Sequence, residues 1–245
     1  MSRSSFINQV EQCVYPVNYI PPITSRAIID DDNRKRETNT TNFPYSAMCF
    51  LEITWPNGER ETGTGAVVAK KSILTAGHCV YQVERGGYAT KIIAYPGHNG
   101  KSSPLGSYTS STLTILSKWR TEGGAAYDAA FIRFSTNIGN NTGIMGYGNY
   151  SDSDLLSNVL RVTGYPGDKT GGTLWKHGGK PSSLTPLVIK YKMDAVNGQS
   201  GAPVYKRTNN QIVGVHSRGN SKMNYGKRID STFFSLMRTV KQEDQ

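Results

Sequence analysis

Three residues in separate parts of the chain together carry the chemistry of an activated nucleophile. Ser200 lies in VNGQSGAP (residues 196–203), His78 follows an apolar run in LTAGHCVY, and Asp128 opens the apolar segment DAAFIRF. A serine hydroxyl needs a neighbouring base to become nucleophilic at neutral pH, and histidine suits this task because its unperturbed pKa is near neutrality. A carboxylate behind the imidazole fixes its tautomer and stabilises its charged form. We therefore predict that Ser200 is the nucleophile, His78 the general base and Asp128 its orienting acid.

The glycine before Ser200 suits an oxyanion hole. Gly198 precedes the serine by two residues, so the backbone N–H groups of Gly198 and Ser200 can point at one carbonyl oxygen. Taken alone, each residue has a plainer interpretation, namely a surface turn, a structural histidine at a strand end and an aspartate that begins a strand. Together they form one chemical set, and the order His78, Asp128, Ser200 is that of the chymotrypsin triad.

Such a set has to be positioned by rigid elements, and the sequence predicts strands for this purpose. Gly, Tyr, Thr, Ser and Val are frequent, which suits many short strands joined by turns. His78 and Asp128 fall in a first cluster of predicted strands and Ser200 in a second, so a cleft between two halves would assemble the site. The predicted strands lie at residues 47–55, 64–77 (two strands around a hairpin at Lys70 and Lys71), 90–95, 111–116, 128–134, 159–166, 187–193, 202–207 and 211–217.

The strand clusters and the two ends of the chain suggest a domain organisation. Two runs of short strands predict two small barrels or sandwiches. Asp230 and Ser231 can cap a C-terminal helix over TFFSLMRTVKQ, whose apolar residues give one broad face. We divide the chain into a propeptide-like arm (1–27), a first half with His78 and Asp128 (28–140), and a second half with Ser200 and the helix (141–245).

Composition excludes several classes of function. The chain has 245 residues, of which 36% are hydrophobic and 19% charged, so it can bury a sizeable core. A net charge of +10 would attract polyanions, but the basic residues are spread out and no zinc-finger or RRM-type pattern is present. No apolar run approaches the ~18 residues of a membrane helix. We predict neither nucleic acid nor a membrane as a partner, and no metal or other cofactor.

Several motifs resemble one family of proteases. TAGHC, YDAAF and GQSGAPV are similar to the three triad motifs of chymotrypsin-fold serine proteases. The resemblance is closer to the bacterial glutamyl endopeptidases of the V8-like and Bacillus types, because RETNTTNFPYSA, VTGYPGDKTGGTLWKHGG, SKWRTEG and GVHSRG also match. It covers about residues 28–240. It implies an all-β fold of two antiparallel six-stranded β-barrels with a C-terminal helix, and a serine endopeptidase that cuts after Glu or sometimes Asp.

The resemblance assigns roles to individual residues. By position, His78, Asp128 and Ser200 correspond to the triad, and the N–H groups of Gly198 and Ser200 to the oxyanion hole. His216 matches the histidine that meets the acidic P1 side chain in the S1 pocket. An imidazole there is physically reasonable, because it can donate a hydrogen bond to a carboxylate.

The sequence departs from the family around S1. Ala195 stands five residues before the nucleophile, where the family usually has a threonine, and Ser217 or Arg218 could supply the missing donor. Asp194 leaves a second specificity open, since an acid at that spacing reads basic side chains in trypsin-like enzymes, although Bacillus-type relatives also carry it. Gln199 stands where trypsin-type enzymes have an aspartate that pairs with the new terminal amine, so we do not expect activation through that ion pair.

The resemblance also implies processing and secretion. Mature relatives begin near Ile28 with a free amine close to S1, so we predict that an activating protease cleaves after Arg26 or a residue or two away. The unprocessed chain would then be poorly active. This chain shows no signal peptide, so secretion rests on the resemblance alone. We expect a monomer that acts on polypeptides with an acidic P1 residue.

The three cysteines leave at least one thiol unpaired, because their number is odd. Bacillus-type enzymes pair the counterpart of Cys79 with a cysteine at the position of Gly63, so that bridge is absent here. Bridges between Cys49 and Cys79 or between Cys13 and Cys49 remain open, with a buried free thiol favoured for Cys49.

Two alternatives from other classes remain. A protease-fold binding protein that has lost catalysis would keep the fold, although the complete set of motifs argues against it. A fluorophosphonate that labels Ser200 would distinguish the enzyme from such a binder. A basic module for nucleic acid or membrane surfaces would instead show polyanion binding that falls steeply with salt.

Overall fold

The computed structural model describes residues 28–244 of the chain. The predictions for residues 1–27, including the pairing of Cys13 and the cleavage near Arg26, lie outside these residues. Within the described part, no helix is both long and apolar enough to cross a membrane.

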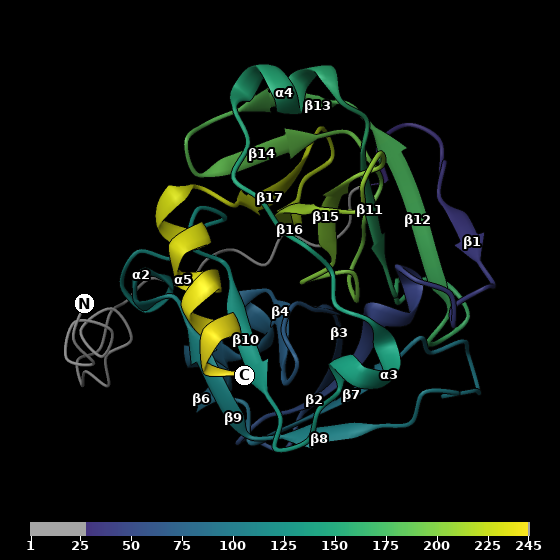
Figure 1. The fold of residues 1–245 in the computed structure, drawn as a ribbon, viewed down its shortest axis with the longest axis vertical. Helices are drawn as coiled ribbons and strands as arrows, with labels where there is room; N and C mark the ends of the chain where they lie inside the picture. Colours follow the sequence, from purple (N-terminus) through teal and green to yellow (C-terminus); the bar gives the residue numbers. More distant parts are fainter. Residues whose placement is uncertain (1–27, 245) are drawn as a thin grey trace.

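Two antiparallel sheets form the two halves of the molecule and lie one above the other in Figure 1. Over residues 28–244, the lower sheet has seven strands in the order β8-β7-β2-β3-β4-β10-β9, and the upper has eight in the order β1-β12-β11-β15-β16-β17-β14-β13. The lower strands are β2 (Met48–Thr54), β3 (Arg60–Val67), β4 (Ser72–Thr75), β7 (Lys91–Pro96), β8 (Tyr108–Ser110), β9 (Thr112–Ile115) and β10 (Ala130–Arg133). The upper strands are β1 (Lys35–Glu37), β11 (Leu160–Gly164), β12 (Leu174–Gly179), β13 (Pro181–Leu184), β14 (Val188–Tyr191), β15 (Pro203–Lys206), β16 (Ile212–Gly219) and β17 (Asn224–Arg228). A separate pair is formed by β5 (Tyr81–Gln82) and β6 (Gly87–Tyr88).

This arrangement agrees with the predicted all-β architecture of two antiparallel halves. Each sheet has more strands than the six that were predicted, because short strands at the edges, such as β1 and β13, extend the upper sheet. The strands predicted from apolar runs are present with shifts of a few residues at their ends, as is usual for element boundaries.

β2 shows how the sequence pattern produces such a strand. Cys49, Leu51 and Ile53 are buried, whereas Glu52 between them is exposed, as expected for a strand with one face on the core. β2 pairs with β3 on one side and with β7 on the other, so it lies inside the sheet.

One hydrophobic core joins the two halves. It contains side chains of the lower sheet together with Tyr165, Tyr205 and Val215 of the upper half and Phe233 and Met237 of the C-terminal helix. A smaller cluster lies within the upper half. Because the larger core is shared, the halves cannot separate without exposing packed apolar surface.

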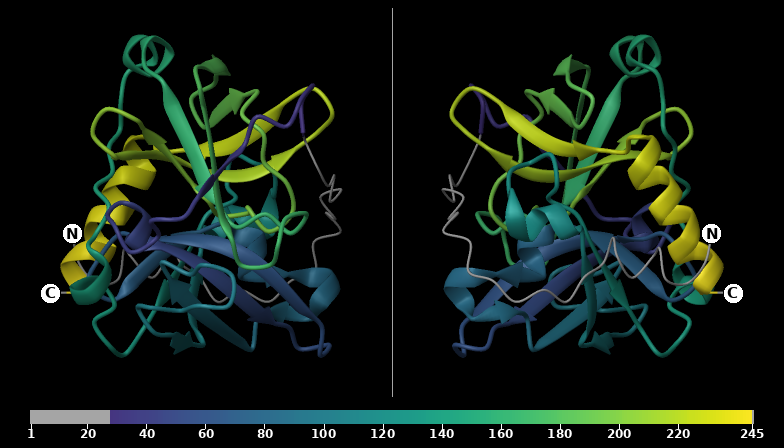
Figure 2. Two further views of the ribbon diagram at one scale, coloured as in Figure 1. Left: turned by 90° about the vertical axis from the view of Figure 1, so that its right-hand side faces the viewer. Right: turned by 90° about the vertical axis from the view of Figure 1, so that its left-hand side faces the viewer.

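The predicted C-terminal helix is present as α5 (Ser231–Glu243). The Asp230 side chain caps it by accepting hydrogen bonds from the N–H groups of Thr232 (2.9 Å) and Phe233 (3.2 Å). Figure 2 shows α5 along one side of the molecule, next to both halves. The other helices are short: α2 (Ser117–Thr121), α3 (Gly139–Thr142), α4 (Asp152–Ser157), η1 (Tyr45–Ala47), η2 (Gly77–Cys79) and η3 (Val83–Arg85).

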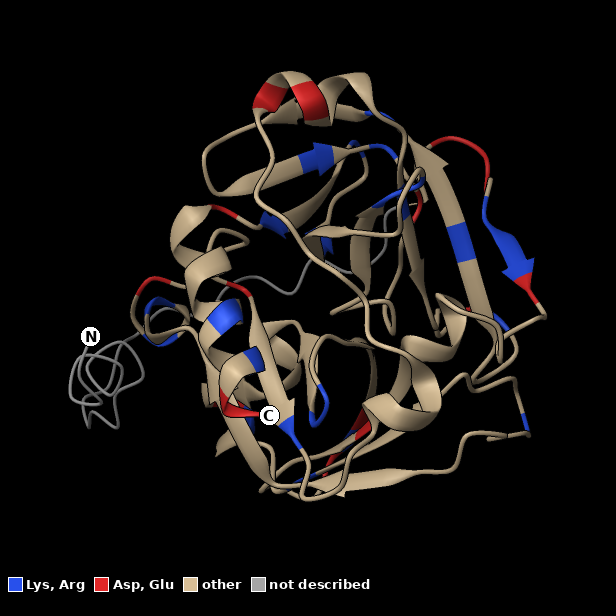
Figure 3. Cartoon of the chain, in the orientation of Figure 1, with Lys and Arg blue, Asp and Glu red and all other residues tan. Residues whose placement is uncertain are grey.

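The domain boundary at residue 140 stays a prediction, and one strand from the first predicted domain lies in the upper sheet. β1 pairs with β12 of the upper sheet, although residues 28–140 otherwise supply the lower sheet. The two strands lie beside each other in Figure 1. Lys and Arg are found on strands of both sheets and on α5 (Figure 3), as their spread in the sequence suggested.

Candidate active site

Strand pairing brings His78 and Asp128 together. His78 lies in the turn η2 just after β4, and Asp128 lies just before β10. Because β4 and β10 are antiparallel, with Thr75 opposite Ala130, the end of one strand lies next to the start of the other. The His78 N–H donates to Asp128 Oδ1 at 2.9 Å, and the ring atom Nδ1 lies 2.8 Å from Oδ2. The fold therefore fixes the imidazole at both its backbone and its ring.

The Asp128 carboxylate is fully buried but remains ionised at neutral pH. Burial alone would raise its pKa, but the charges of His78 and Arg218 and the hydrogen bond from the Ser217 hydroxyl outweigh burial and lower the pKa to about 2. Arg218 Nη2 lies 3.9 Å from Asp128 Oδ2. A buried carboxylate that stays negative can hold and stabilise a protonated imidazole.

Ser200 lies on the turn that leads into β15, and this turn is pressed against the lower sheet. The Ser200 carbonyl accepts a hydrogen bond from Thr64 N at 2.8 Å. Gly201, which follows it, has φ +83°, and a Cβ there would lie 2.2 Å from Thr64 O. Only glycine fits at this position, so contact between the halves fixes the height of Ser200 above the lower sheet.

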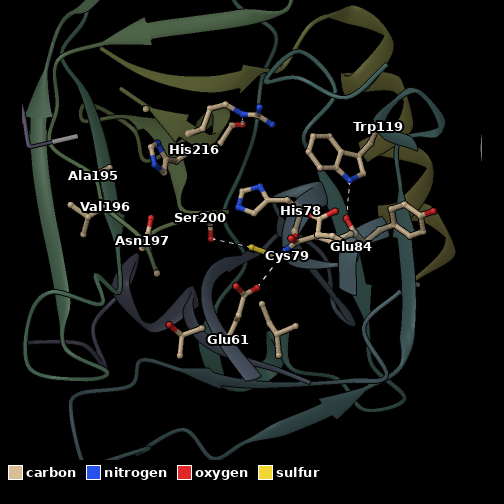
Figure 4. Close-up of a pocket in the computed structure, with 18 of the residues that line it drawn as sticks. Glu61, His78, Cys79, Glu84, Trp119, Ala195, Val196, Asn197, Ser200 and His216 are labelled. Atoms are coloured by element: carbon tan, nitrogen blue, oxygen red, sulfur yellow. Dashed lines mark hydrogen bonds between the residues drawn. The ribbon is translucent and has the colours of Figure 1, made fainter. Parts of the chain in front are cut away.

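Ser200 and His78 line the same cavity of about 420 Å³, and Figure 4 shows both side chains facing it. Within the described residues, no hydrogen bond joins Ser200 Oγ to the His78 ring. Such contacts are often long in unliganded enzymes and shorten when substrate binds. The prediction that a residue of the first half meets one of the second half at a single cavity is therefore consistent with the structure.

The backbone near Ser200 provides two donors without partners. Among the described residues, no acceptor takes the N–H of Gly198 or that of Ser200, and both residues line the cavity. Gly198 has φ +90°, and a Cβ there would lie 2.5 Å from Tyr165 O and 2.9 Å from Gly167 N. The Gly198 carbonyl accepts a hydrogen bond from Thr64 Oγ1 at 2.8 Å. This loop can present two N–H groups to a developing oxyanion.

His216 is buried in β16 and lines the cavity together with Ala195. Its Nδ1 atom lies 2.7 Å from the hydroxyl of Tyr191, a residue of β14. Burial and the nearby His78 lower the pKa of His216 to about 3, so the ring is neutral at physiological pH. Burial also raises the pKa of Tyr191, which therefore keeps its proton. Sequence reasoning missed Tyr191, because only strand pairing brings it to His216.

Asp194 has backbone partners away from the cavity. Its Oδ1 accepts a hydrogen bond from Ile29 N at 2.8 Å, and its Oδ2 accepts one from Asn33 N at 3.0 Å. The side chain is fully buried, and the residue is not among those that line the cavity. The position that could have read a basic P1 residue instead binds the N-terminal segment.

The two residues considered as substitutes for a threonine at Ala195 have other contacts. The Ser217 hydroxyl donates to Asp128, as described above. The Arg218 guanidinium lies 5.8 Å from the centre of the Trp119 ring, on the side of the cavity near His78. Ala195 itself lines the cavity with a methyl group and supplies no donor.

Cys49 and Cys79 are both buried free thiols, so the bridge between them that the sequence left open is not formed. Burial raises the pKa of each thiol well above its usual range. A free thiol had been favoured for Cys49. Cys79 lies next to Ser200, with Sγ 3.6 Å from the Ser200 carbonyl oxygen. Over residues 28–244, no three His, Cys, Asp or Glu side chains are grouped as a metal site requires.

Comparison with known proteins agrees with this geometry. A family model for trypsin matches residues 32–234. A glutamyl endopeptidase of Bacillus licheniformis is 35% identical over 234 residues, which cover 91% of this chain and 72% of that protein. A Bacillus subtilis protein named extracellular metalloprotease is 34% identical over 220 residues, covering 88% of this chain and 70% of that protein. A glutamyl endopeptidase of Staphylococcus aureus is 30% identical over 201 residues, covering 80% of this chain and 58% of that protein.

Solved structures show the same relationship. A Glu endopeptidase in complex with MPD matches with a TM-score of 0.80 and 30% identity, covering 88% of this chain and all of that chain (100%). The protease Anisep from Arthrobacter nicotinovorans shares the fold, with a TM-score of 0.72 and 22% identity over 85% of this chain and 99% of that chain. The molecule is a chymotrypsin-fold serine endopeptidase. The chain belongs to the trypsin family, and glutamyl endopeptidases are among its relatives.

Proposed function

We propose that the chain is a secreted endopeptidase that cuts peptide bonds after glutamate and, less readily, after aspartate. The observation that carries this proposal is the cavity that His216 shares with Ser200 and His78. A peptide with its scissile carbonyl at Ser200 would place its P1 side chain near His216. Secretion is supported by a relative that is named extracellular.

The catalytic steps follow from the roles proposed for the triad. Ser200 Oγ attacks the carbonyl carbon while its proton passes to His78 Nε2. Asp128, ionised and bound to the opposite ring nitrogen, stabilises the imidazolium that forms. The N–H groups of Gly198 and Ser200 donate to the carbonyl oxygen as it becomes negative. His78 then gives the proton to the leaving amine, and water repeats the sequence on the acyl-enzyme.

His216 would bind the P1 carboxylate as a neutral donor. When the Tyr191 hydroxyl donates to Nδ1, the proton of the neutral ring is on Nε2. That N–H can donate to a carboxylate without the cost of burying a second charge. Ala195 adds no hydroxyl, so the hydrogen bond from His216 is the main source of P1 selectivity in this proposal.

Activation is proposed to require cleavage near Arg26. The first described residues support this, because Ile29 N lies 2.8 Å from the carboxylate of Asp194, the residue before Ala195 of the cavity. A terminal amine created a few residues earlier would lie on the same side of S1. Its positive charge would favour an acidic P1 side chain.

The test is cleavage of a mixed peptide library by protein whose mature N-terminus has been sequenced. We expect enrichment of Glu at P1, with Asp second. His216→Ala is expected to lower kcat/KM by about 10- to 100-fold on Glu substrates and much less on Gln substrates, since it removes a hydrogen bond to a charged group. Ser200→Ala, which should abolish cleavage, is the control for contaminating proteases.

Four outcomes would contradict parts of the proposal. Lys or Arg at P1 would favour specificity through Asp194. Equal losses on Glu and Gln substrates would make His216 a structural residue. Active enzyme that still begins at Met1 would exclude activation near Arg26. Processed protein whose Ser200 is not labelled by a fluorophosphonate would be an inactive binding protein with a protease fold.

A further inference from the structure

A buried arginine lies directly behind the proposed oxyanion loop. The Arg34 side chain, from the segment that precedes β1, has no solvent exposure. Its Nη1 atom donates to Gln199 Oε1 at 3.3 Å, and Gln199 is the fully buried residue before Ser200. Figure 3 shows the acidic turn and the basic start of β1 in this segment, beside the upper sheet. A charged group that does not line the cavity thus contacts the loop.

Two carboxylates hold the guanidinium in place. Asp168 accepts hydrogen bonds from Nη1 at 3.0 Å and Nη2 at 2.6 Å, and Asp32 accepts from Nε and Nη2, both at 2.9 Å. Burial alone would lower the pKa of Arg34, but these hydrogen bonds raise it above its usual value. Because the planar guanidinium is held in a fork by both carboxylates, the donor that faces Gln199 has a fixed position.

The Gln199 side chain transmits this position to the loop. Its Oε1 accepts a second hydrogen bond, from Val196 N at 3.1 Å, while Gln199 N donates to Val196 O at 3.0 Å. Within the described residues, its buried Nε2 has no partner. Only the oxygen of the amide is therefore used: Val196 N donates to it across the turn that contains Gly198, and Arg34 donates to it from outside the turn.

The same segment also holds the start of the loop. Ile29 N and Asn33 N donate to Asp194, which stands six residues before Ser200. The middle of the loop is fixed separately, because Gly167 N donates to Asn197 O at 2.7 Å. Residues 29–34 therefore contact both ends of the segment from Asp194 to Gln199.

We propose that Arg34 is a positioning residue for catalysis. Through Gln199 it holds the turn in which the N–H groups of Gly198 and Ser200 face the cavity. An internal cation thus holds the residues before Ser200 in place, as an ion pair with the new terminal amine does in trypsin-type enzymes. The proposal rests on the function proposed above, in which these two N–H groups form the oxyanion hole.

The test substitutes Gln199 rather than Arg34, because removal of Arg34 would leave two carboxylates without their partner and could prevent folding. Gln199→Met keeps the volume of the side chain and removes the acceptor. Misdirecting one oxyanion donor costs on the order of 10²-fold in rate, so we expect kcat to fall by about 10- to 100-fold with KM changed by less than about 3-fold. A peptide aldehyde, which forms an oxyanion in the site, should lose affinity by a similar factor.

The control variants separate positioning from a merely structural role. Gln199→Glu retains an oxygen that accepts from Arg34 and Val196 N, so it should recover most of the lost kcat. Lys169→Met removes the ion pair of Lys169 with Asp32 (2.7 Å) but no contact of Gln199, and it should leave kcat unchanged. If Gln199→Met lowers only the melting temperature, while kcat per titrated active site and aldehyde affinity are unchanged, the proposal is overturned.

The rate at which a fluorophosphonate labels Ser200 distinguishes failure of this proposal from failure of the proposed function. That reaction uses the oxyanion hole but needs no P1 side chain. Slower labelling of Gln199→Met supports the positioning role whatever the P1 specificity is. Labelling at the wild-type rate overturns it.

Discussion

At the scale of single residues, the proposed preference for an acidic P1 side chain depends on His216. A histidine with an ordinary pKa of about 6.5 would be cationic below that pH and would lose its charge above it. The pKa of His216 is lowered to about 3 by burial and by the nearby His78, so the ring stays neutral from weakly acidic to alkaline pH. Its role then depends on the tautomer set by Tyr191 rather than on charge.

The pH dependence of selectivity follows from this neutral ring. The ratio of kcat/KM for a Glu substrate to that for the matching Gln substrate should be constant from about pH 5.5 to 8.5, because both the P1 carboxylate (pKa about 4.3) and His216 keep one form there. A cationic histidine would instead lose its charge above its pKa, and the ratio would then fall by up to about tenfold per pH unit. Pre-steady-state or initial-rate assays on paired substrates measure the ratio.

A matched variant checks the tautomer. Tyr191→Phe removes only the hydroxyl that faces Nδ1, and it should lower the Glu-to-Gln ratio several-fold with little change on Gln substrates. A ratio that declines steadily with pH in the wild type would mean that substrate binding brings a proton to His216.

At the scale of elements, strand β3 carries Gly63, the position at which the sequence lacks a cysteine that could form a disulfide with Cys79. Gly63 lies in β3, and a Cβ built there would be 3.1 Å from Cys79 Sγ. That separation is close to the distance of about 3 Å between a Cβ atom and the far sulfur of a disulfide. The buried thiol of Cys79 thus lacks only a partner sulfur.

Gly63→Cys should therefore form a disulfide with Cys79. A bridge across a loop of this size is expected to raise the free energy of unfolding by about 3 kcal/mol. Thiol titration would show no free thiol at Cys79, and chemical denaturation with and without reductant would measure the gain. Gly63→Ser is the control for the added side chain. A thiol count one higher than in the wild type, or stability that does not respond to reductant, would contradict the prediction.

At the scale of the whole molecule, the C-terminal helix holds the lower half although it follows the upper half in the sequence. The rings of Phe233 and Phe131 lie 6.0 Å apart, and Phe131 belongs to β10, the strand that follows Asp128. The end of the same helix is bound to the turn between β3 and β4, since Asp244 Oδ2 accepts a hydrogen bond from Lys71 N at 3.0 Å. Packing therefore couples α5 to the strand pair that brings His78 and Asp128 together.

Phe233→Ala should destabilise the whole molecule rather than one half. Removal of a buried phenylalanine costs about 3–5 kcal/mol, and the shared core predicts a single cooperative transition. Urea unfolding followed both by tryptophan fluorescence and by residual activity would test this. Ser235→Ala, on the exposed side of α5, should change stability by less than about 0.5 kcal/mol. Two separate transitions would show that the halves fold independently.

The structure also shows which elements a sequence pattern can reveal. Strands such as β2 were predicted because they are apolar runs bounded by turn residues. β13 (PSSL) and β17 (NYGKR) were missed, since they contain few apolar residues and become strands by pairing with β14 and β16. Propensity alone cannot identify a strand that depends on its neighbours.

The sequence by itself determined the candidate nucleophile, base and acid, the main strands and the capped C-terminal helix. These are carried by short motifs and by local periodicity, which depend on residues close together in the chain. Only the tertiary structure decided that Asp194 binds the N-terminal segment, that Tyr191 faces His216 and that Arg34 contacts Gln199. The partners in these contacts are brought together by sheet pairing and by burial. They are far apart in the chain, so their contacts cannot be predicted from residue spacing.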